Sequence, residues 1–164
     1  MVNVINGNLN NSKENFVVRL VDCQGDTEMD GHVEKEYLKY LKHYNKTKEN
    51  IHGRVQYVPV DIWAIGMADT IENKNVIAYD TEYQYIANIF GHDSHCDKKE
   101  NLKAIKKGLK DVFYKARKIG ATIAIPFGMG KANWNDIYSA INEMSEHFNV
   151  DVGLYKMKKN KGKS

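Results

Sequence analysis

The sequence predicts an α/β fold, in which helices cover both faces of a mixed, mostly parallel central sheet in three layers (α/β/α). The run "FVVRLV" at residues 16–21 is apolar almost throughout, as expected of a strand that is covered on both faces. Residues 102–116 carry a continuous helical stripe, and "TIAI" at residues 122–125 follows as a second buried strand. Strands that alternate with helices in this way indicate a parallel sheet with helical crossovers.

The amino-terminal half contains four short strand patterns and one helical pattern. The strand patterns lie at residues 2–6, 16–21, 54–60 and 83–90. Apolar residues at three- and four-residue steps predict a helix that starts at Val33 and is carried by Val33, Tyr37, Tyr40, Leu41 and Tyr44. Residues 61–80 fit either a strand or a hairpin that ends in a polar turn at Glu72–Asn75.

The carboxy-terminal half gives sharper patterns. The apolar stripe of its first helix consists of Leu102, Ile105, Leu109, Val112, Phe113 and Ala116. Asp97 or Ser94 is placed to cap this helix, and Gly120 is a suitable stop. A second helix is predicted from Trp134 to Phe148, with Asn133 as its amino-terminal cap, and "VDVGLY" at residues 150–155 closes the chain as a strand.

The composition is typical of one globular domain with a substantial core. Of 164 residues, 42 % are hydrophobic and 27 % are charged. No apolar run approaches the ~20 residues needed to cross a bilayer, and "MVNVINGNLN" lacks the profile of a signal peptide. Cys23 and Cys96 provide no disulfide framework, so we expect a cytoplasmic protein without a membrane partner.

The formal net charge of +3 comes from the end of the chain, because five lysines lie within the last nine residues. Removing those five from the 24 basic residues leaves 19, against 21 acidic ones. The rest of the chain is therefore slightly acidic, and nucleic acid is not a favoured partner. We expect a single domain over residues 1–156 and a basic, flexible tail over residues 157–164.

Four segments, taken in order, carry a resemblance to a known family. They read "VINGNLN", "FVVRLVDCQG", "YIANIFG" and "LKAIKKGLKDVFYKARKIGATIAIPFGMG", and a tryptophan that opens a helix follows the last of them. Together they resemble a macro domain of the small phage and bacterial type, including those that remove ADP-ribose or a phosphate of ADP-ribose-1″-phosphate. The resemblance covers residues 2–156 and implies that ADP-ribose lies across the carboxyl ends of the central strands.

The resemblance also implies two glycine-bearing loops that hold the diphosphate and the distal ribose through backbone N–H groups. The first loop would contribute Gly25, Gly31 and His32. The second would contribute Phe127, Gly128, Met129, Gly130 and Lys131. Asn8 matches the aspartate that contacts adenine in the family, and Phe90 or Phe127 is a candidate to stack on the adenine.

The departures from the family pattern bear on the activity. Asp22 stands where active relatives carry an asparagine that positions the distal ribose and the attacking water. The first loop adds Asp26, Glu28 and Asp30, whose charges oppose a diphosphate unless they point outward or hold a cation. One hydrolytic branch of the family uses a lysine in the segment that matches "NIFGHD" and an aspartate in the second loop, but "NIFGHD" contains no lysine and "GMGKANW" contains no aspartate.

Three other features have competing interpretations. Lys131 is either a point charge that replaces lost phosphate donors or a solvated lysine before a helix. "HDSHCD" at residues 92–97 holds zinc-ligand residue types without a paired spacing, so no metal site is expected. Cys23 lies at the end of a buried strand, where a thiol is expected to be inert rather than nucleophilic.

The expected function is binding of an ADP-ribose-type or NAD-derived signalling nucleotide, with little or no hydrolysis and no cofactor. In a phage protein, such a site would sequester a nucleotide immune signal. One alternative is an ADP-ribose-1″-phosphate phosphatase or ADP-ribosyl hydrolase with Asp22 as general base. Another is a degenerate macro domain that contacts a partner protein through the apolar segment Ile62–Ala68. The sequence leaves the oligomeric state open.

Overall fold

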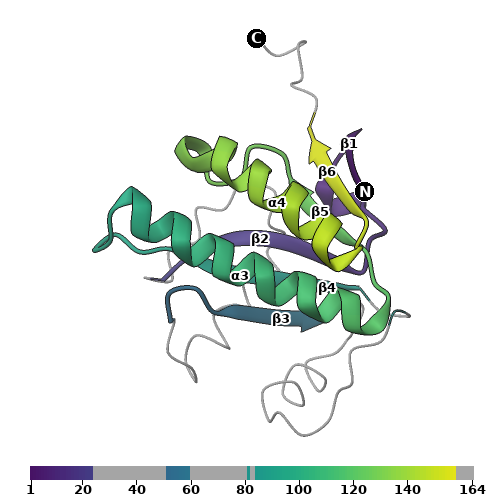
Figure 1. Cartoon of the computed structure of the whole chain (residues 1–164), viewed down its shortest axis with the longest axis horizontal. Helices are drawn as coiled ribbons and strands as arrows, with labels where there is room; N and C mark the ends of the chain where they lie inside the picture. The colour runs from purple at the N-terminus through teal and green to yellow at the C-terminus, as the bar shows by residue number, and fades with distance from the viewer. Residues whose placement is uncertain (24–50, 60–80, 82–83, 158–164) are drawn as a thin grey trace, which may run out of the picture.

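A computed structural model describes residues 1–23, 51–59, 81 and 84–157 of the chain. The described elements, in chain order, are β1 (Val2–Asn6), η1 (Leu9–Asn11), β2 (Phe16–Asp22), β3 (Val55–Pro59), β4 (Tyr85–His92), α3 (Lys98–Ile119), β5 (Ile123–Pro126), η2 (Lys131–Asn133), α4 (Trp134–Phe148) and β6 (Val152–Lys156). Figure 1 shows the two long helices side by side across one face of the sheet. Each predicted strand and helix within these residues is present.

The six strands form one sheet in the order β1-β6-β5-β2-β4-β3. All neighbouring pairs are parallel except β3 and β4, which run antiparallel. From β2 the described strands continue with β3 at the edge of the sheet and then with β4 beside β2, and α3 leads from β4 to β5 on the other side of β2. The direction in which successive strands are added therefore reverses between β2 and β5. The predicted mixed, mostly parallel sheet is confirmed.

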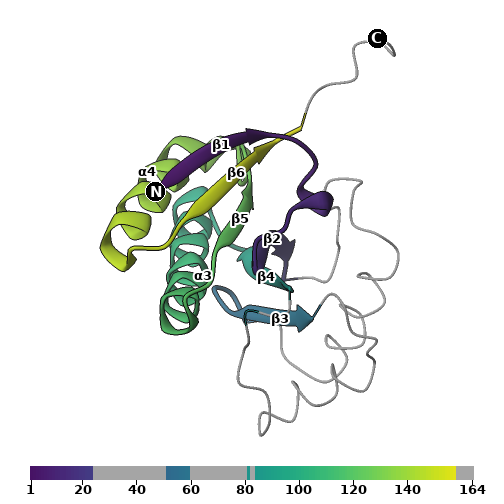
Figure 2. The same ribbon diagram turned by 90° about the vertical axis from the view of Figure 1, so that its right-hand side faces the viewer.

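The core lies between the sheet and the pair α3 and α4, which cover the same face (Figure 2). The central strands β2 and β4 are buried along nearly their whole length, which explains their continuous apolar sequences. The largest fully buried side chains on this face come from four strands and both helices: Phe16, Tyr85, Ile89, Ile105, Leu109, Phe113, Ile123, Ile125, Ile137, Ile141 and Leu154. This packing fixes the positions of the strand ends.

Helix α3 begins and ends as its sequence predicts. The side chain of Asp97 accepts a hydrogen bond from the backbone N–H of Glu100, and the Glu100 carboxylate accepts one from the N–H of Asp97. Gly120 adopts the left-handed conformation after the last turn, with φ of 70°. Both helix ends are therefore fixed by local signals.

The predicted capping role of Asn133 is wrong. Asn133 does precede α4, but its side chain accepts no hydrogen bond from the helix. Its backbone has φ of −100° and ψ of 5°, whereas a capping residue is usually extended. The buried Asn133 amide instead donates to the carbonyl oxygen of Lys98 at 3.1 Å, which ties the start of α4 to the start of α3.

Several predictions fall on residues outside the described ranges. These are the helix that starts at Val33, the strand or hairpin over residues 61–80, the Ile62–Ala68 segment and nearly all of the lysine-rich tail. The second helical layer is thus not part of what the structure describes. Within the described residues, neither helix has the length and apolarity that crossing a membrane requires.

Candidate functional site

A cavity of about 690 Å³ opens where β2 and β5 separate. These neighbouring strands pair only at Phe16–Ile123 and Val17–Ala124, although β2 continues to Asp22. The split lies at the carboxyl ends of the strands and at the point where the strand order reverses, which is where open α/β sheets bind ligands. The volume suits a nucleotide-sized molecule. The wall is formed by Leu9, Arg19, Leu20, Val21, Asp22, Gly91, His92, Lys98, Asn101, Ile105, Pro126, Phe127, Gly128, Met129, Gly130, Lys131, Ala132 and Asn133.

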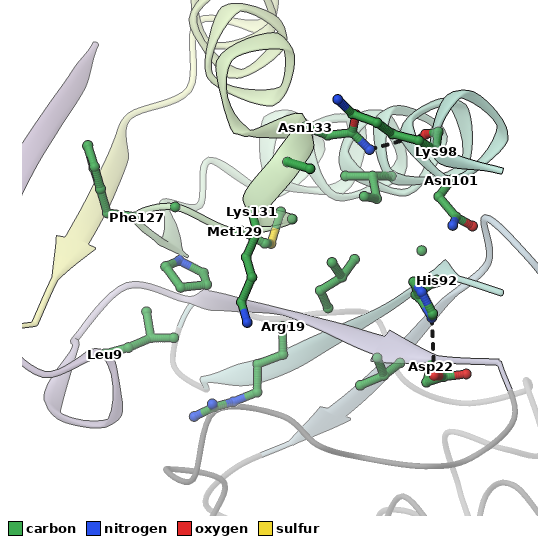
Figure 3. A pocket seen from close by; sticks show the side chains of 18 residues that line it. Leu9, Arg19, Asp22, His92, Lys98, Asn101, Phe127, Met129, Lys131 and Asn133 are labelled. Carbon is green, nitrogen blue, oxygen red and sulfur yellow. Dashed lines mark hydrogen bonds and ion pairs between the residues drawn. The ribbon is translucent and has the colours of Figure 1, made fainter. Parts of the chain in front are cut away.

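The chemistry of the wall changes along the cavity. Figure 3 shows Leu9 and Phe127 at one end, Arg19 and Lys131 in the middle, and the pair of Asp22 and His92 at the other end. The cavity thus has an apolar end, a cationic middle and an end that offers a carboxylate and an imidazole. These three zones come from the turn after β1, the split between β2 and β5, and the ends of β2 and β4.

The turn after β5 presents two glycines in conformations that other residues rarely adopt. Gly128 has φ of 86° and Gly130 has φ of 77°. The N–H groups of Met129 and Lys131 donate to the carbonyl groups of Pro126 and Gly128. Within the part of the chain that the structure describes, no backbone carbonyl accepts from the N–H of Gly128 or Gly130. Both glycines line the cavity, which makes their N–H groups candidate donors to an anion bound there.

Lys131 is held in an unusual backbone conformation, with φ of 36°. A left-handed non-glycine residue is disfavoured because its Cβ approaches the carbonyl oxygen. Its exposed side chain extends into the middle of the cavity (Figure 3). The turn therefore maintains a strained residue whose ammonium group faces the cavity.

Arg19 is a cationic wall residue that the sequence analysis did not select. Its side chain is only 5 % exposed and lies on the middle of β2. The strand register places Asn88 of β4 beside it and Gln56 of β3 beyond, and the Asn88 amide donates to Gln56 at 3.2 Å. A single charge inside the apolar run "FVVRLV" is the signal that could have identified it, since a buried charge normally has a structural or functional partner.

Asp22 and His92 meet through an irregularity in the sheet. The register of β2 and β4 shifts after Val21, which pairs with Phe90, so that Asp22 pairs with His92 and Gly91 has no partner in β2. The Nδ1 atom of His92 lies 3.1 Å from Oδ2 of Asp22, with side-chain exposures of 55 % and 25 %. Bulges often occur beside functional sites, where they redirect a side chain. The sequence analysis treated His92 only as a possible metal ligand.

The structure brings six of the predicted ligand-binding residues to the cavity wall: Asp22, Phe127, Gly128, Met129, Gly130 and Lys131. Asn8 is not in the wall, although the next residue, Leu9, is. Phe90 is 4 % exposed, packs with Val21 and Cys23, and is absent from the wall. Gly25, Gly31 and His32, together with the acidic residues Asp26, Glu28 and Asp30, lie outside the described residues.

Phe127 differs from the free stacking surface that the sequence suggests. Its ring already packs against Trp134 at a centroid distance of 5.0 Å and against Tyr138 at 6.5 Å. The Lys156 ammonium lies 5.2 Å from the same ring. Phe127 thus closes the apolar end of the cavity as part of an aromatic cluster with Trp134 and Tyr138.

The environment of the two cysteines disfavours thiolate chemistry. Burial, followed by the nearby charges of Asp93 and Asp22, raises the pKa of Cys23 to about 11. Burial and neighbouring carboxylates also raise the pKa of Cys96. Both thiols therefore stay protonated at neutral pH, so neither is an activated nucleophile.

The cluster "HDSHCD" has local roles in the structure. Asp97 caps α3, and the Asp93 carboxylate accepts from the backbone N–H of His95. The Sγ atom of Cys96 lies 3.8 Å from Nδ1 of His52. Among the described residues, no three His, Cys, Asp or Glu side chains come together in a way that could hold a metal ion.

Comparison with known proteins identifies the architecture. No family model and no curated protein matches the sequence. The fold, however, matches the macrodomain of Thermus aquaticus DarG with a TM-score of 0.64 and 20 % identity, over 94 % of this chain and 97 % of that one. The macrodomain of Mycobacterium tuberculosis DarG gives 0.65 and 16 %, over 97 % and 99 %. Thermosipho africanus DarTG, solved in complex with ADP-ribose, gives 0.66 and 15 %, over 94 % of this chain and 41 % of that one. This chain has the macrodomain fold.

Proposed function

We propose that this chain, which has the macrodomain fold, binds an ADP-ribose-type nucleotide in the cavity between β2 and β5. The observation that carries the proposal is the sequence of zones along the cavity wall: apolar, cationic, then carboxylate and imidazole. ADP-ribose presents a base, a diphosphate and a distal ribose in the same order. Each part of an ADP-ribose molecule that lies along the cavity would therefore contact a zone of suitable chemistry.

The middle zone has the groups that a diphosphate needs. Two backbone N–H groups, of Gly128 and Gly130, are available at the wall, and the cations Arg19 and Lys131 line the same space. Charge-assisted hydrogen bonds from lysine or arginine to phosphate are about twice as strong as neutral ones. Among the described wall residues, Asp22 is the one carboxylate, against three lysine or arginine side chains. The zone thus favours an anion.

The structural relatives support the same ligand class. Thermosipho africanus DarTG was solved in complex with ADP-ribose, and this chain has the same fold as a part of it that makes up 41 % of its length. In this chain the pairing of β2 and β5 ends at Val17 and Ala124 while β2 continues to Asp22, so the crevice belongs to the sheet rather than to one loop.

We also propose that binding leads to little or no hydrolysis by the routes that the family resemblance implies. Asp22 occupies the place of the asparagine, "NIFGHD" lacks the lysine of the other route, and "GMGKANW" lacks its aspartate. A protein that holds such a nucleotide without breaking it acts by sequestering it. In a phage, the sequestered molecule would be a nucleotide immune signal made from NAD.

Isothermal titration calorimetry with ADP-ribose tests the proposal. We expect saturable binding with one ligand per chain, and an affinity about tenfold lower in Lys131→Met, because that change removes a phosphate partner. Lys110→Met is the matched control, since Lys110 is an exposed lysine of α3 outside the cavity wall. The absence of heat from ADP-ribose in the folded wild-type protein would refute the proposal.

A second candidate function is hydrolysis of a bond at the distal ribose, and the contact between Asp22 and His92 favours it. A carboxylate that orients an imidazole is a common arrangement for proton transfer from water. Incubation of ADP-ribosylated protein and of ADP-ribose-1″-phosphate with the wild-type protein and with Asp22→Asn decides between the two functions. Product formation that is lost in Asp22→Asn would establish hydrolysis. If neither sample forms product, binding without hydrolysis is the function that is supported.

A further inference from the structure

We infer that the contact between Asp22 and His92 makes the distal end of the cavity selective for a ligand that ends in hydroxyl groups, and against one that ends in a phosphate. This inference rests on the proposed nucleotide-binding function and specifies the class of ligand. It concerns one end of the cavity, whereas the affinity for the diphosphate comes from the glycine turn and the cations in the middle.

The first step is the hydrogen-bonding character of the pair. Oδ2 of Asp22 lies 3.1 Å from Nδ1 of His92, so a neutral imidazole in this contact carries its proton on Nδ1. The other ring nitrogen, Nε2, is then a hydrogen-bond acceptor, and an ionised carboxylate offers only acceptors. A partner for this end must therefore donate hydrogen bonds.

The second step is the match to ligand chemistry. The vicinal hydroxyl groups of a ribose provide two O–H donors. A phosphate monoester carries about two negative charges near neutral pH and offers acceptor oxygens. It would meet the Asp22 carboxylate with like charge, and the exposed atoms of the Asp22 and His92 pair offer it no hydrogen-bond donor, so it is disfavoured beside this pair.

The third step is the separation of charges along the cavity. In Figure 3 the Asp22 and His92 pair lies well away from Lys131 and Arg19, and the Lys98 ammonium points away from the pair. The pair is partly buried, with 25 % of the Asp22 side chain exposed, so solvent does not fully screen its charge. The nearby wall residue Asn101 accepts from the N–H of Asp93 through its Oδ1 at 3.0 Å, which leaves its Nδ2 as an uncharged donor near this end.

The fourth step is the fixed position of the carboxylate. Asp22 is the last residue of β2, and the register shift that pairs it with His92 follows directly after the buried residue Val21. The next backbone N–H, of Cys23, donates to the carbonyl oxygen of His92 at 2.8 Å. The backbone of Asp22 is therefore held in the sheet, so a bound phosphate cannot move this residue away from the distal end of the cavity.

The test compares two ligands that differ only at this end, ADP-ribose and ADP-ribose-1″-phosphate, by calorimetry at about pH 8, where histidine is ordinarily neutral. We expect the wild-type protein to bind ADP-ribose at least about tenfold more tightly. In Asp22→Asn, which keeps the size of the side chain and adds an N–H donor, the ratio should fall to about threefold or less. The matched control is Asp136→Asn, on the exposed start of α4 and outside the cavity wall.

Each outcome has a distinct meaning. A wild-type protein that binds the phosphorylated ligand as tightly as ADP-ribose refutes the inference while leaving the proposed function intact. So does an Asp22→Asn protein that keeps the wild-type ratio, provided that its thermal unfolding is still cooperative. If neither ligand binds the wild-type protein, the proposed function itself fails. If Asp22→Asn does not fold, the wild-type ratio alone supports or refutes the selectivity.

Discussion

At the scale of single residues, Lys131 combines a strained backbone, which lowers local stability, with a side chain that lies at the cavity. Its φ of 36° is disfavoured for a lysine, and its neighbour Gly130 shows that glycine is compatible with such a turn. A lysine would be kept in this conformation only if its ammonium group has a use. Strain of this kind is concentrated at binding sites.

We predict that Lys131→Gly raises the free energy of unfolding by up to about 1 kcal/mol, because it removes the left-handed strain. The same change should weaken ADP-ribose binding about tenfold. Urea denaturation and calorimetry measure the two effects. Asn149→Gly is the matched control: Asn149 also has a positive φ, of 55°, but lies at the end of α4, so it should leave binding unchanged. A Lys131→Gly protein with full affinity would contradict the role of Lys131.

The pKa of Cys23 leads to a second prediction at this scale. Because burial raises that pKa to about 11, the thiolate is scarce at neutral pH and becomes abundant only as the pH rises past that value. We expect iodoacetamide to modify Cys23 at about pH 7 more slowly than it modifies a free thiol, with the rate rising steeply up to the pH of unfolding. Mass spectrometry of the Cys96→Ser protein isolates this site. Rapid labelling at about pH 7 would be inconsistent with the buried, acidic surroundings of Cys23.

The residues that could be predicted are those with a recognisable local pattern. The paired glycines and Lys131 follow directly from "GMGK", and Asp22 follows from its place after a buried strand. Arg19 and His92 were missed for a physical reason: their roles depend on the split from β5 and on the bulge opposite β4. Both are contacts between strands that lie far apart in the sequence.

At the scale of elements, the turn between β5 and α4 has to be rigid to keep its donors at the cavity wall. A Cβ atom on Gly130 would lie 2.5 Å from Cδ1 of Ile137, which is fully buried in α4. A Cβ atom on Gly128 would meet nothing within 4 Å. Both glycines have positive φ, so the two positions differ mainly in packing.

We predict that Gly130→Ala is more destabilising than Gly128→Ala. Each substitution places an alanine at positive φ, at a cost of about 1 kcal/mol. Gly130→Ala also overpacks the buried Ile137, which adds about 1–3 kcal/mol. Urea denaturation of the two variants measures the difference, and each serves as the control for the other. Equal losses of stability would mean that the turn moves freely relative to α4.

The elements themselves were largely predictable because their signals are local. Apolar periodicity located α3 and α4, and the capping box at Asp97 and the stop at Gly120 set the limits of α3. The cap expected from Asn133 failed because its amide donates across to Lys98, in a different helix. Local pattern cannot anticipate a side chain that is recruited by tertiary packing.

At the scale of the whole molecule, the positive charge and the binding cavity are separate features. The lysine-rich end accounts for the net charge of +3, whereas the cavity cations Arg19 and Lys131 belong to the sheet and its turn. The proposed domain over residues 1–156 therefore contains every wall residue that the structure describes. The tail should be dispensable for binding.

We predict that removal of residues 158–164 changes neither the melting temperature nor the affinity for ADP-ribose by a measurable amount. The deletion keeps Lys156, whose ammonium contacts the ring of Phe127 at the cavity. Thermal unfolding and calorimetry on the shortened chain provide the measurement, and added salt shows whether any residual difference is electrostatic. A large loss of affinity would assign the binding to the lysine-rich tail instead of the cavity.

The fold as a whole could be predicted further than the site. Alternating strands and helices leave few arrangements open, and the family resemblance selected among them. The site depends on where two strands diverge and on which side chains then face the gap, and neither is encoded in a short run of residues. The wall of the cavity could therefore be predicted only in part, from its glycine turn and from Asp22.

A crystal structure of the wild-type protein with ADP-ribose is the most direct test of the central claim. We predict that the diphosphate lies against the turn of Gly128, Gly130 and Lys131, with the adenine toward Leu9 and the distal ribose beside Asp22 and His92. A ligand bound elsewhere, or bound in the cavity with the opposite direction, would contradict the account.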